Sequence, residues 1–155
     1  MSSDLHVLIV ELETQQERLR CESFDHNHAW AVGNRLIELA AQRDLSVTVD
    51  ITIGEQQVFH AARPGTDADN DWWIARKIRS VKKFGDSSFL LGRRHAAAGT
   101  DFNEVTGLDF SDYVAHGGCF PIRTRSGEFV GTVTVSGLPQ ADDHALVVEV
   151  LSEFF

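Results

Sequence analysis

The sequence predicts an α+β domain in which an antiparallel β-sheet is flanked by helices, and three observations lead to this prediction. Residues 46–53 alternate apolar with polar side chains, which is the period-two pattern of a half-buried strand. Two pairs of β-rich segments are joined by short turns, and strands joined by tight turns must be antiparallel. Helical periodicity in the remaining segments places helices against the sheet. The expected strands are 46–53, 57–61, 113–123 and 129–135.

Two helices are expected before the first strand. Apolar residues from Leu5 to Leu19 recur at helical spacing, so residues 4–18 should form an amphipathic helix. After a short extended piece, Asp25 is well placed to cap a second helix over residues 26–43. The apolar stripe of this second helix consists of Trp30, Gly33, Leu36, Ile37, Ala40 and Ala41.

A third and a fourth helix follow the first hairpin, and each is bounded by a polar cap and a glycine. Residues 69–71 can cap the third helix, which ends at Gly85. Ser87 can cap the fourth helix over residues 88–98, and Gly99 is the expected left-handed stop.

Length and composition fit a single domain, with an N-terminal helix over residues 1–19 and a core over residues 20–155. The chain carries 14 Lys+Arg against 23 Asp+Glu, a formal net charge of −9. This balance argues against nucleic-acid binding, which needs a basic face. No apolar run approaches the length of a membrane span and the start lacks the basic residues of a signal peptide, so a cytoplasmic protein without a membrane partner is expected.

No metal site is expected either. The two cysteines lack the CxxC spacing of a structural zinc site and are too few for a disulfide framework. His26 and His28 are two residues apart, so on a helix they point in different directions.

A basic helix is the first candidate site. Five of the 14 basic residues lie between Arg76 and Lys83, a stretch without an acid. Such a face can bind the carboxylate or phosphate of a small ligand, and Arg76 and Arg79 have the guanidinium geometry for bidentate contacts. The competing interpretation is structural, because the helix macrodipole favours lysines at the C-terminal end.

A pair of glycines inside an expected strand marks the second candidate site. Gly117 and Gly118 forfeit packing there, and such pairs commonly mark a bulge or a close approach by another chain or a ligand. His116 beside them could act as an acid, a base or a metal ligand. Cys119 is a weaker candidate, since a buried structural cysteine is the commoner case.

The turn between the last strand and the last helix is the third candidate. Backbone amides around Ser136 and Gly137 could receive an anion. Against this, Asp142 and Asp143 already lie where the anion would bind, so capping of the helix that opens at Pro139 is the competing interpretation.

Several ordered strings are shared with a known family. They are His116-Gly-Gly-x-Phe-Pro-Ile, Gly131-Thr-Val-Thr-Val-Ser-Gly-Leu-Pro-Gln-Ala-Asp-Asp-His-Ala-Leu, Phe59-His-Ala, Pro64-Gly-Thr and Asn70-Asp. Over about residues 20–154 the chain resembles the haem-degrading domain family, in its branch of small uncharacterised proteins related to GlcG and HbpS. The resemblance implies an α/β/α sandwich, profilin-like in outline, and a tendency to form homo-oligomers.

The resemblance also makes haem a candidate ligand. Arginines would pair with its propionates, and a histidine could be the axial ligand of its iron. The candidate arginines are Arg76, Arg79 and Arg94, and the candidate axial histidines are His116, His28 and His95.

Three functions are compatible with these observations. The first is an oligomeric module without established catalysis that binds a small anion or haem between the basic helix and the glycine-rich hairpin. The second is an interaction scaffold or adaptor, supported by the adjacent Trp72 and Trp73 and by Phe154 and Phe155; a eukaryotic relative in the family is linked to the targeting of tail-anchored proteins. The third is an enzyme that acts on a small carbonyl metabolite with His116 as the base.

Overall fold

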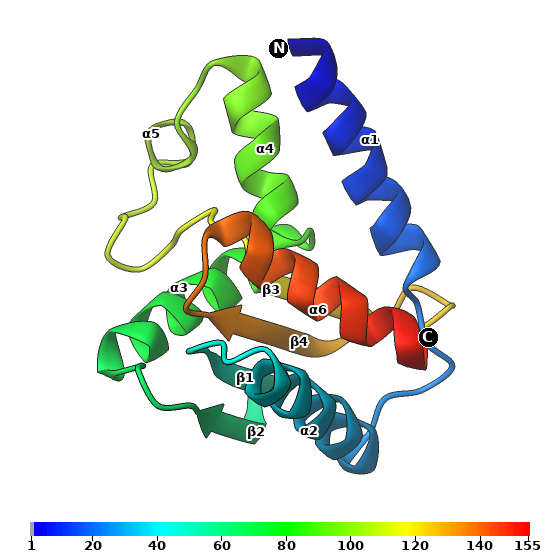
Figure 1. The fold of residues 1–155 in the computed structure, drawn as a ribbon. Coiled ribbons are helices and arrows are strands. Elements are labelled where there is room, and N and C mark those ends of the chain that lie inside the picture. The colour runs from blue at the N-terminus through cyan, green and yellow to red at the C-terminus, as the bar shows by residue number, and fades with distance from the viewer. Residues whose placement is uncertain (1) are drawn as a thin grey trace.

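The computed structural model describes residues 2–155, which form a four-stranded antiparallel sheet with helices around it (Figure 1). The strands are β1 (Thr48–Ile53), β2 (Gln56–Ala62), β3 (Cys119–Arg123) and β4 (Phe129–Ser136), and their order in the sheet is β2-β1-β4-β3. The pairs β1–β2 and β3–β4 are the two expected hairpins, so the predicted α+β class is confirmed. No helix in the described range is long and apolar enough to cross a membrane.

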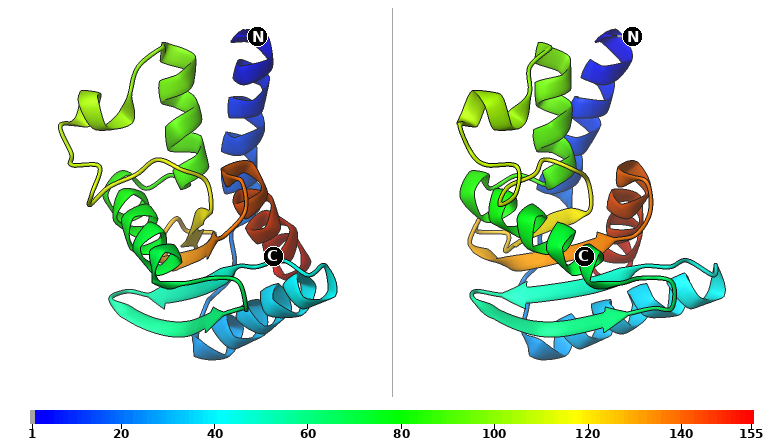
Figure 2. Two further views of the ribbon diagram at one scale, coloured as in Figure 1. Left: turned by 60° about the vertical axis from the view of Figure 1, so that its left-hand side comes forward. Right: turned by 90° about the vertical axis from the view of Figure 1, so that its left-hand side faces the viewer.

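Helices cover both faces of the sheet, which gives three layers (Figure 2). Helices α2 (His26–Gln42) and α6 (Gln140–Phe154) pack on one face, whereas α3 (Ala68–Phe84) packs on the other. The face toward α2 and α6 holds the main hydrophobic core, because alternate residues of β1 and β4 point to it. The central members of this core are Val47, Val49, Ile51, Val133, Val135, Leu36, Val147 and Leu151.

The opposite face of the central strands is polar although it is buried. Asp50 lies there at the centre of β1, opposite Thr134 of β4. Its carboxylate accepts hydrogen bonds from Thr52 Oγ1 at 2.8 Å and from Gln57 Nε2 at 2.5 Å. The side of the sheet that α3 covers therefore accommodates polar groups, which the apolar core cannot do.

Helices α1 (Ser2–Arg18) and α4 (Ser88–Ala98) lie side by side and project away from the sheet (Figure 1). Leu12, Phe89 and Leu90 bury their side chains between these helices. Both helices occur where the sequence predicts them.

The expected helix caps are largely confirmed. Asp25 caps α2 in a capping box with His28, and Gly85 takes the left-handed conformation that ends α3. Helix α3, however, begins before the expected residues 69–71. Asp67 is its N-cap, because the Asp67 carboxylate and the Asn70 side chain form a capping box that adds a first turn.

The expected strand over residues 113–123 is wrong in its first half. Only residues from Cys119 onward form β3, and they are preceded by the short helix α5 (Phe102–Thr106) and an irregular segment. This segment buries Ala115 against Leu91 of α4, and Asn103 Nδ2 donates hydrogen bonds to the carbonyl oxygens of Leu108 and Tyr113. An apolar run that packs as a buried loop has the same composition as a strand, so sequence pattern alone does not separate the two.

Candidate functional site

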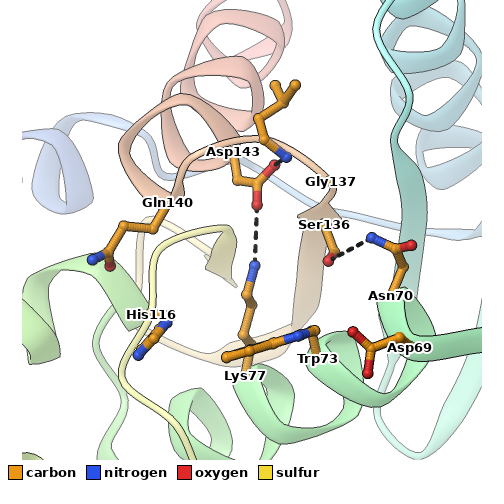
Figure 3. Close-up of a pocket in the computed structure, with 10 residues that line it drawn as sticks. Asp69, Asn70, Trp73, Lys77, His116, Ser136, Gly137, Gln140 and Asp143 are labelled. Carbon is orange, nitrogen blue, oxygen red and sulfur yellow. Dashed lines mark hydrogen bonds and ion pairs between the residues drawn. The ribbon is translucent and has the colours of Figure 1, made fainter. Parts of the chain in front are cut away.

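A cavity of about 230 Å³ lies between α3, the segment before β3 and the turn from β4 into α6. Three of the sequence-predicted site residues line it, His116, Ser136 and Gly137. The sequence reasoning did not single out its other lining residues for this role. These are Asp69, Asn70, Trp73, Lys77, Leu138, Gln140 and Asp143 (Figure 3).

Lys77 points across this cavity from α3 toward α6 (Figure 3). Its Nζ lies 3.3 Å from Asp143 Oδ2 and donates a hydrogen bond of 3.1 Å to the carbonyl oxygen of Val135. Both charged side chains are only 3% exposed. Burial lowers the pKa of Lys77 and raises the pKa of Asp143 to about 6, so desolvation works against the charged forms of both groups.

His116 forms the wall of the cavity opposite the pair of Ser136 and Asn70 (Figure 3). Its half-buried ring stacks against Trp73 with 5.0 Å between ring centroids. Burial lowers the pKa of His116, and the positive charges of Lys77 and Arg76 lower it further. The imidazole is therefore held mainly neutral near pH 7, the form in which it can accept a proton.

The turn from β4 into α6 forms part of the site. Asp143 Oδ1 accepts a hydrogen bond of 2.9 Å from the backbone N–H of Leu138, which precedes the helix. The predicted side-chain cap is therefore wrong, because α6 has Pro139 as its N-cap and no side-chain cap hydrogen bond within the described residues. On the other side of the turn, Ser136 Oγ accepts a hydrogen bond of 3.2 Å from Asn70 Nδ2. The Asp143 carboxylate thus binds the backbone just before α6 and also contacts Lys77.

The paired glycines permit close contacts within the chain itself. Gly118 has φ of +135°, and a Cβ at this position would lie 2.6 Å from Lys77 Nζ and collide with the Val135 carbonyl oxygen. A Cβ at Gly117 would collide with the backbone of Gln140. The close approach at the glycines is made by β4, α6 and the Lys77 side chain of the same chain, whereas the sequence predicts a bulge or an approach by another chain or a ligand. The glycines also precede β3 rather than lying in a strand.

The three predicted arginines lie outside the cavity. The Arg76 guanidinium is buried 3.3 Å from the ring centroid of Trp72, and its Nη1 donates to the carbonyl oxygen of Phe110. Arg79 donates to a backbone carbonyl at Asp112, and Arg94 forms ion pairs with acids of α1 and of the turn before α4. The basic helix thus supplies the cavity with Lys77 instead of an arginine.

A signal for Lys77 is present in the sequence. It lies three residues after Ile74 and four residues before Val81, so it shares the apolar seam of α3. A lysine on the buried face of a helix is an exception to amphipathic patterning, and this exception marks the site.

Comparisons with known proteins place the chain in a family. A model described as "Haem degrading protein HbpS-like" matches residues 24–152. A UPF0303 protein of Streptomyces avermitilis is 55% identical over 146 residues, which covers 94% of this chain and 90% of the relative. A UPF0303 protein of Azotobacter vinelandii is 46% identical and covers 89% of this chain and 83% of its own.

The chain belongs to the HbpS-like haem-degrading protein family. Solved structures agree with this assignment. Ybr137w matches with a TM-score of 0.87 at 29% identity, covering 94% of this chain and 86% of its own. A PduOC–haem complex matches with a TM-score of 0.67 at 17% identity, covering 85% and 94%, which shows a shared fold. The α/β/α arrangement implied by the resemblance is thereby confirmed.

The cavity of this HbpS-like chain does not fit haem. Its volume of about 230 Å³ is below the roughly 300–1,000 Å³ of pockets that hold drug-sized ligands. Arg76, Arg79 and Arg94 contact separate neighbours and do not converge on His116. His28 is engaged in the cap of α2, and His95 lies 3.0 Å from Thr100 Oγ1. These predicted partners of haem are therefore not gathered in one place.

A larger apolar groove of about 460 Å³ between α1 and α6 also lacks the groups that haem needs. Among residues 2–155 no lysine or arginine lines this groove, so no described cation there pairs with propionates. Its histidine, His144, uses Nε2 to contact Gln15 Oε1 at 2.9 Å, and its Nδ1 is buried. Nε2 is thus engaged with Gln15, and Nδ1 is buried without a hydrogen-bond partner among residues 2–155.

Proposed function

We propose that this HbpS-like protein is a binding module for a small anion, which occupies the cavity beside Lys77. The observation that carries the proposal is the buried Lys77 ammonium, the one lysine or arginine among the residues that line the cavity. Ser136 and Gly137 contribute polar contacts to the ligand, and His116 closes the far side. Gly117 and Gly118 act indirectly, because they let β4, α6 and the Lys77 side chain approach closely.

The charges around the cavity make this binding dependent on pH. Asp143 and Asp69 oppose an incoming anion, while Lys77 attracts it. Because the pKa of Asp143 is raised to about 6, binding of an anion near pH 7 is coupled to uptake of a proton by this carboxyl. The affinity should therefore rise as the pH falls toward 6.

Calorimetric titration with pyruvate and with inorganic phosphate tests the proposal. We expect saturable binding that tightens about tenfold from pH 7.5 to pH 6, since one coupled proton changes affinity by up to a factor of ten for each pH unit. Lys77→Met should abolish binding. Lys83→Met, an exposed position on the same helix, should leave it unchanged.

Two results would contradict the proposal. One is unaltered anion binding by Lys77→Met, and the other is affinity that rises with pH. A saturable haem spectrum that persists in Lys77→Met would favour a haem-binding function at another site.

An interaction scaffold is the second candidate function, and an exposed aromatic cluster favours it. Trp72 and Phe110 are 44% and 48% exposed, and they lie against the buried guanidinium of Arg76. Arg76 Nε and Nη2 have no hydrogen-bond partner within residues 2–155. We propose that a second copy of this chain covers the exposed rings of Trp72 and Phe110.

Light scattering tests this self-association. We expect a mass above that of one chain for the wild type, and a lower mass for Trp72→Ala, because this variant removes the exposed ring over Arg76. Val105→Ser, which removes an exposed apolar side chain elsewhere, should keep the wild-type mass. A wild-type mass equal to one chain would rule out the scaffold as described.

A further inference from the structure

The three lysines of the chain differ sharply in their surroundings, although all of them lie on α3. Lys82 and Lys83 are exposed, and Lys82 pairs with Glu55 at the surface. Lys77 is buried beside a cavity large enough for a small metabolite. The chain thus places one lysine amine where a small molecule can meet it away from bulk water.

We propose that Lys77 forms an imine with the carbonyl carbon of a small oxo-acid held in the cavity. This inference rests on the proposed function, because the same cavity must first bind the carboxylate form of the ligand. It adds a covalent step and restricts the ligand to compounds that carry an aldehyde or ketone group.

Geometry favours the amine as a nucleophile. Lys77 Nζ lies at the cavity wall, 3.1 Å from a carbonyl oxygen and 3.3 Å from Asp143 Oδ2, so two acceptors fix its position. Burial lowers its pKa, and the neighbouring Arg76 charge acts in the same direction, whereas Asp143 and Cys119 act against it. Desolvation next to another cation is a known way to activate a lysine amine.

Asp143 is suited to move the proton. Its raised pKa of about 6 makes it a competent acceptor and donor near neutral pH, and Lys77 is within reach of its Oδ2. The other titratable groups at this site are His116 on the segment before β3 and Asp69 on the first turn of α3. The lowered pKa of His116 keeps its ring neutral, so it adds no positive charge beside Lys77.

The step is balanced without any further reactant. The Lys77 ammonium first gives one proton to the Asp143 carboxylate, which leaves a neutral amine. The nitrogen then forms a bond to the carbonyl carbon as the carbon–oxygen π bond breaks; Asp143 gives its proton to the oxygen and receives one from the nitrogen. The carbinolamine then loses its hydroxyl group, which leaves as water together with the second amine proton. The nitrogen–carbon double bond forms in the same step. Amine and carbonyl are converted to imine and water, with no oxidation or reduction.

The cavity also offers donors for the carboxylate end of an oxo-acid. Gln140 Oε1 accepts a hydrogen bond of 3.0 Å from Gly117 N–H, which leaves its amide nitrogen without a protein partner in the described range. Asn70 Nδ2 lies on the other side, bonded to Ser136. Once Lys77 is committed to the imine, these two amides are the groups that hold the carboxylate.

Borohydride trapping with pyruvate tests the inference. The protein is incubated with pyruvate, reduced with borohydride and mapped by peptide mass spectrometry. We expect the reduced adduct at Lys77 at least about tenfold above that at Lys82 or Lys83, since the cavity holds the carbonyl beside this amine and proximity raises the effective concentration of a reactant. In concentrated urea the three lysines should be labelled alike, because the selectivity comes from the folded cavity.

Two comparisons separate this inference from the proposed function. Lactate has the same carboxylate but no carbonyl, so it should bind, compete with pyruvate and give no adduct. At saturating pyruvate the trapped fraction should increase from pH 6 to pH 8, opposite to the pH dependence of anion binding. Equal binding of lactate and pyruvate without selective labelling of Lys77 would overturn the imine but leave anion binding intact, whereas absence of binding by both would overturn the proposed function itself.

Discussion

Asp143→Ala is expected to destabilise the fold by about 3–5 kcal/mol at pH 7, because it leaves the Lys77 ammonium buried without a counter-ion. It also removes the acceptor of the Leu138 N–H at the start of α6. Urea denaturation at several pH values measures the effect. The loss of stability should shrink toward pH 9, because Lys77 can then remain buried in its neutral form. Burial lowers the pKa of Lys77 in the folded state, so the unfolded state binds more protons. The free energy of unfolding of the variant therefore rises with pH.

Two variants serve as controls for Asp143→Ala. Asp142→Ala changes the exposed neighbour and should change the stability by about 0.5 kcal/mol or less. The double variant Lys77→Met with Asp143→Leu should recover much of the lost stability, since it replaces the buried pair by apolar groups. A loss in Asp143→Ala no larger than that of Asp142→Ala would show that the ion pair does not stabilise the fold.

Gly118→Ala is expected to cost about 2–6 kcal/mol and to abolish anion binding. A methyl group here would collide with the Val135 carbonyl oxygen and lie 2.6 Å from Lys77 Nζ, at a backbone φ of +135° that side chains rarely adopt. Overpacking and backbone strain each contribute about 1–3 kcal/mol. Thermal unfolding and pyruvate titration of the same sample measure both effects.

Gly107→Ala is the matched control for Gly118→Ala. Gly107 also has a positive φ, +73°, but a Cβ there meets nothing within 4 Å. This variant measures the loss of stability that a side chain at a positive φ causes by itself, about 1–2 kcal/mol, and it should leave anion binding intact. If both variants lose the same stability and both still bind, the contact between Gly118 and Lys77 is not what requires glycine.

Local patterns predicted most of the fold because they depend on neighbouring residues. The alternation of Val47, Val49 and Ile51 marked β1, and Asp25, Gly85 and Ser87 marked helix ends, since each acts within one turn of its position. The irregular segment before β3 was missed for the same reason. Its burial depends on α4, which is distant in sequence from the residues that it covers.

The elements named as candidate sites lie close together in the structure, but most of the side chains that line the cavity between them were not predicted. The basic helix, the glycine pair and the last turn do meet around one cavity, and His116, Ser136 and Gly137 line it. The charge pattern, however, favoured Arg76 and Arg79 over Lys77. A cluster of like charges shows that a helix is basic but not which member faces inward, and Arg76 is buried under Trp72 by stacking that no spacing rule specifies.

The sequence by itself determined the order of the elements apart from α5, the two hairpins, the family and the presence of one basic helix in an acidic chain. Only the tertiary structure decided that Lys77 and Asp143, 66 residues apart, share one desolvated pocket, and that the glycines make room for them. The physical reason is that periodicity and capping are local properties of the chain. Desolvation and charge pairing, by contrast, arise when distant segments exclude water together, and these determine the chemistry of Lys77.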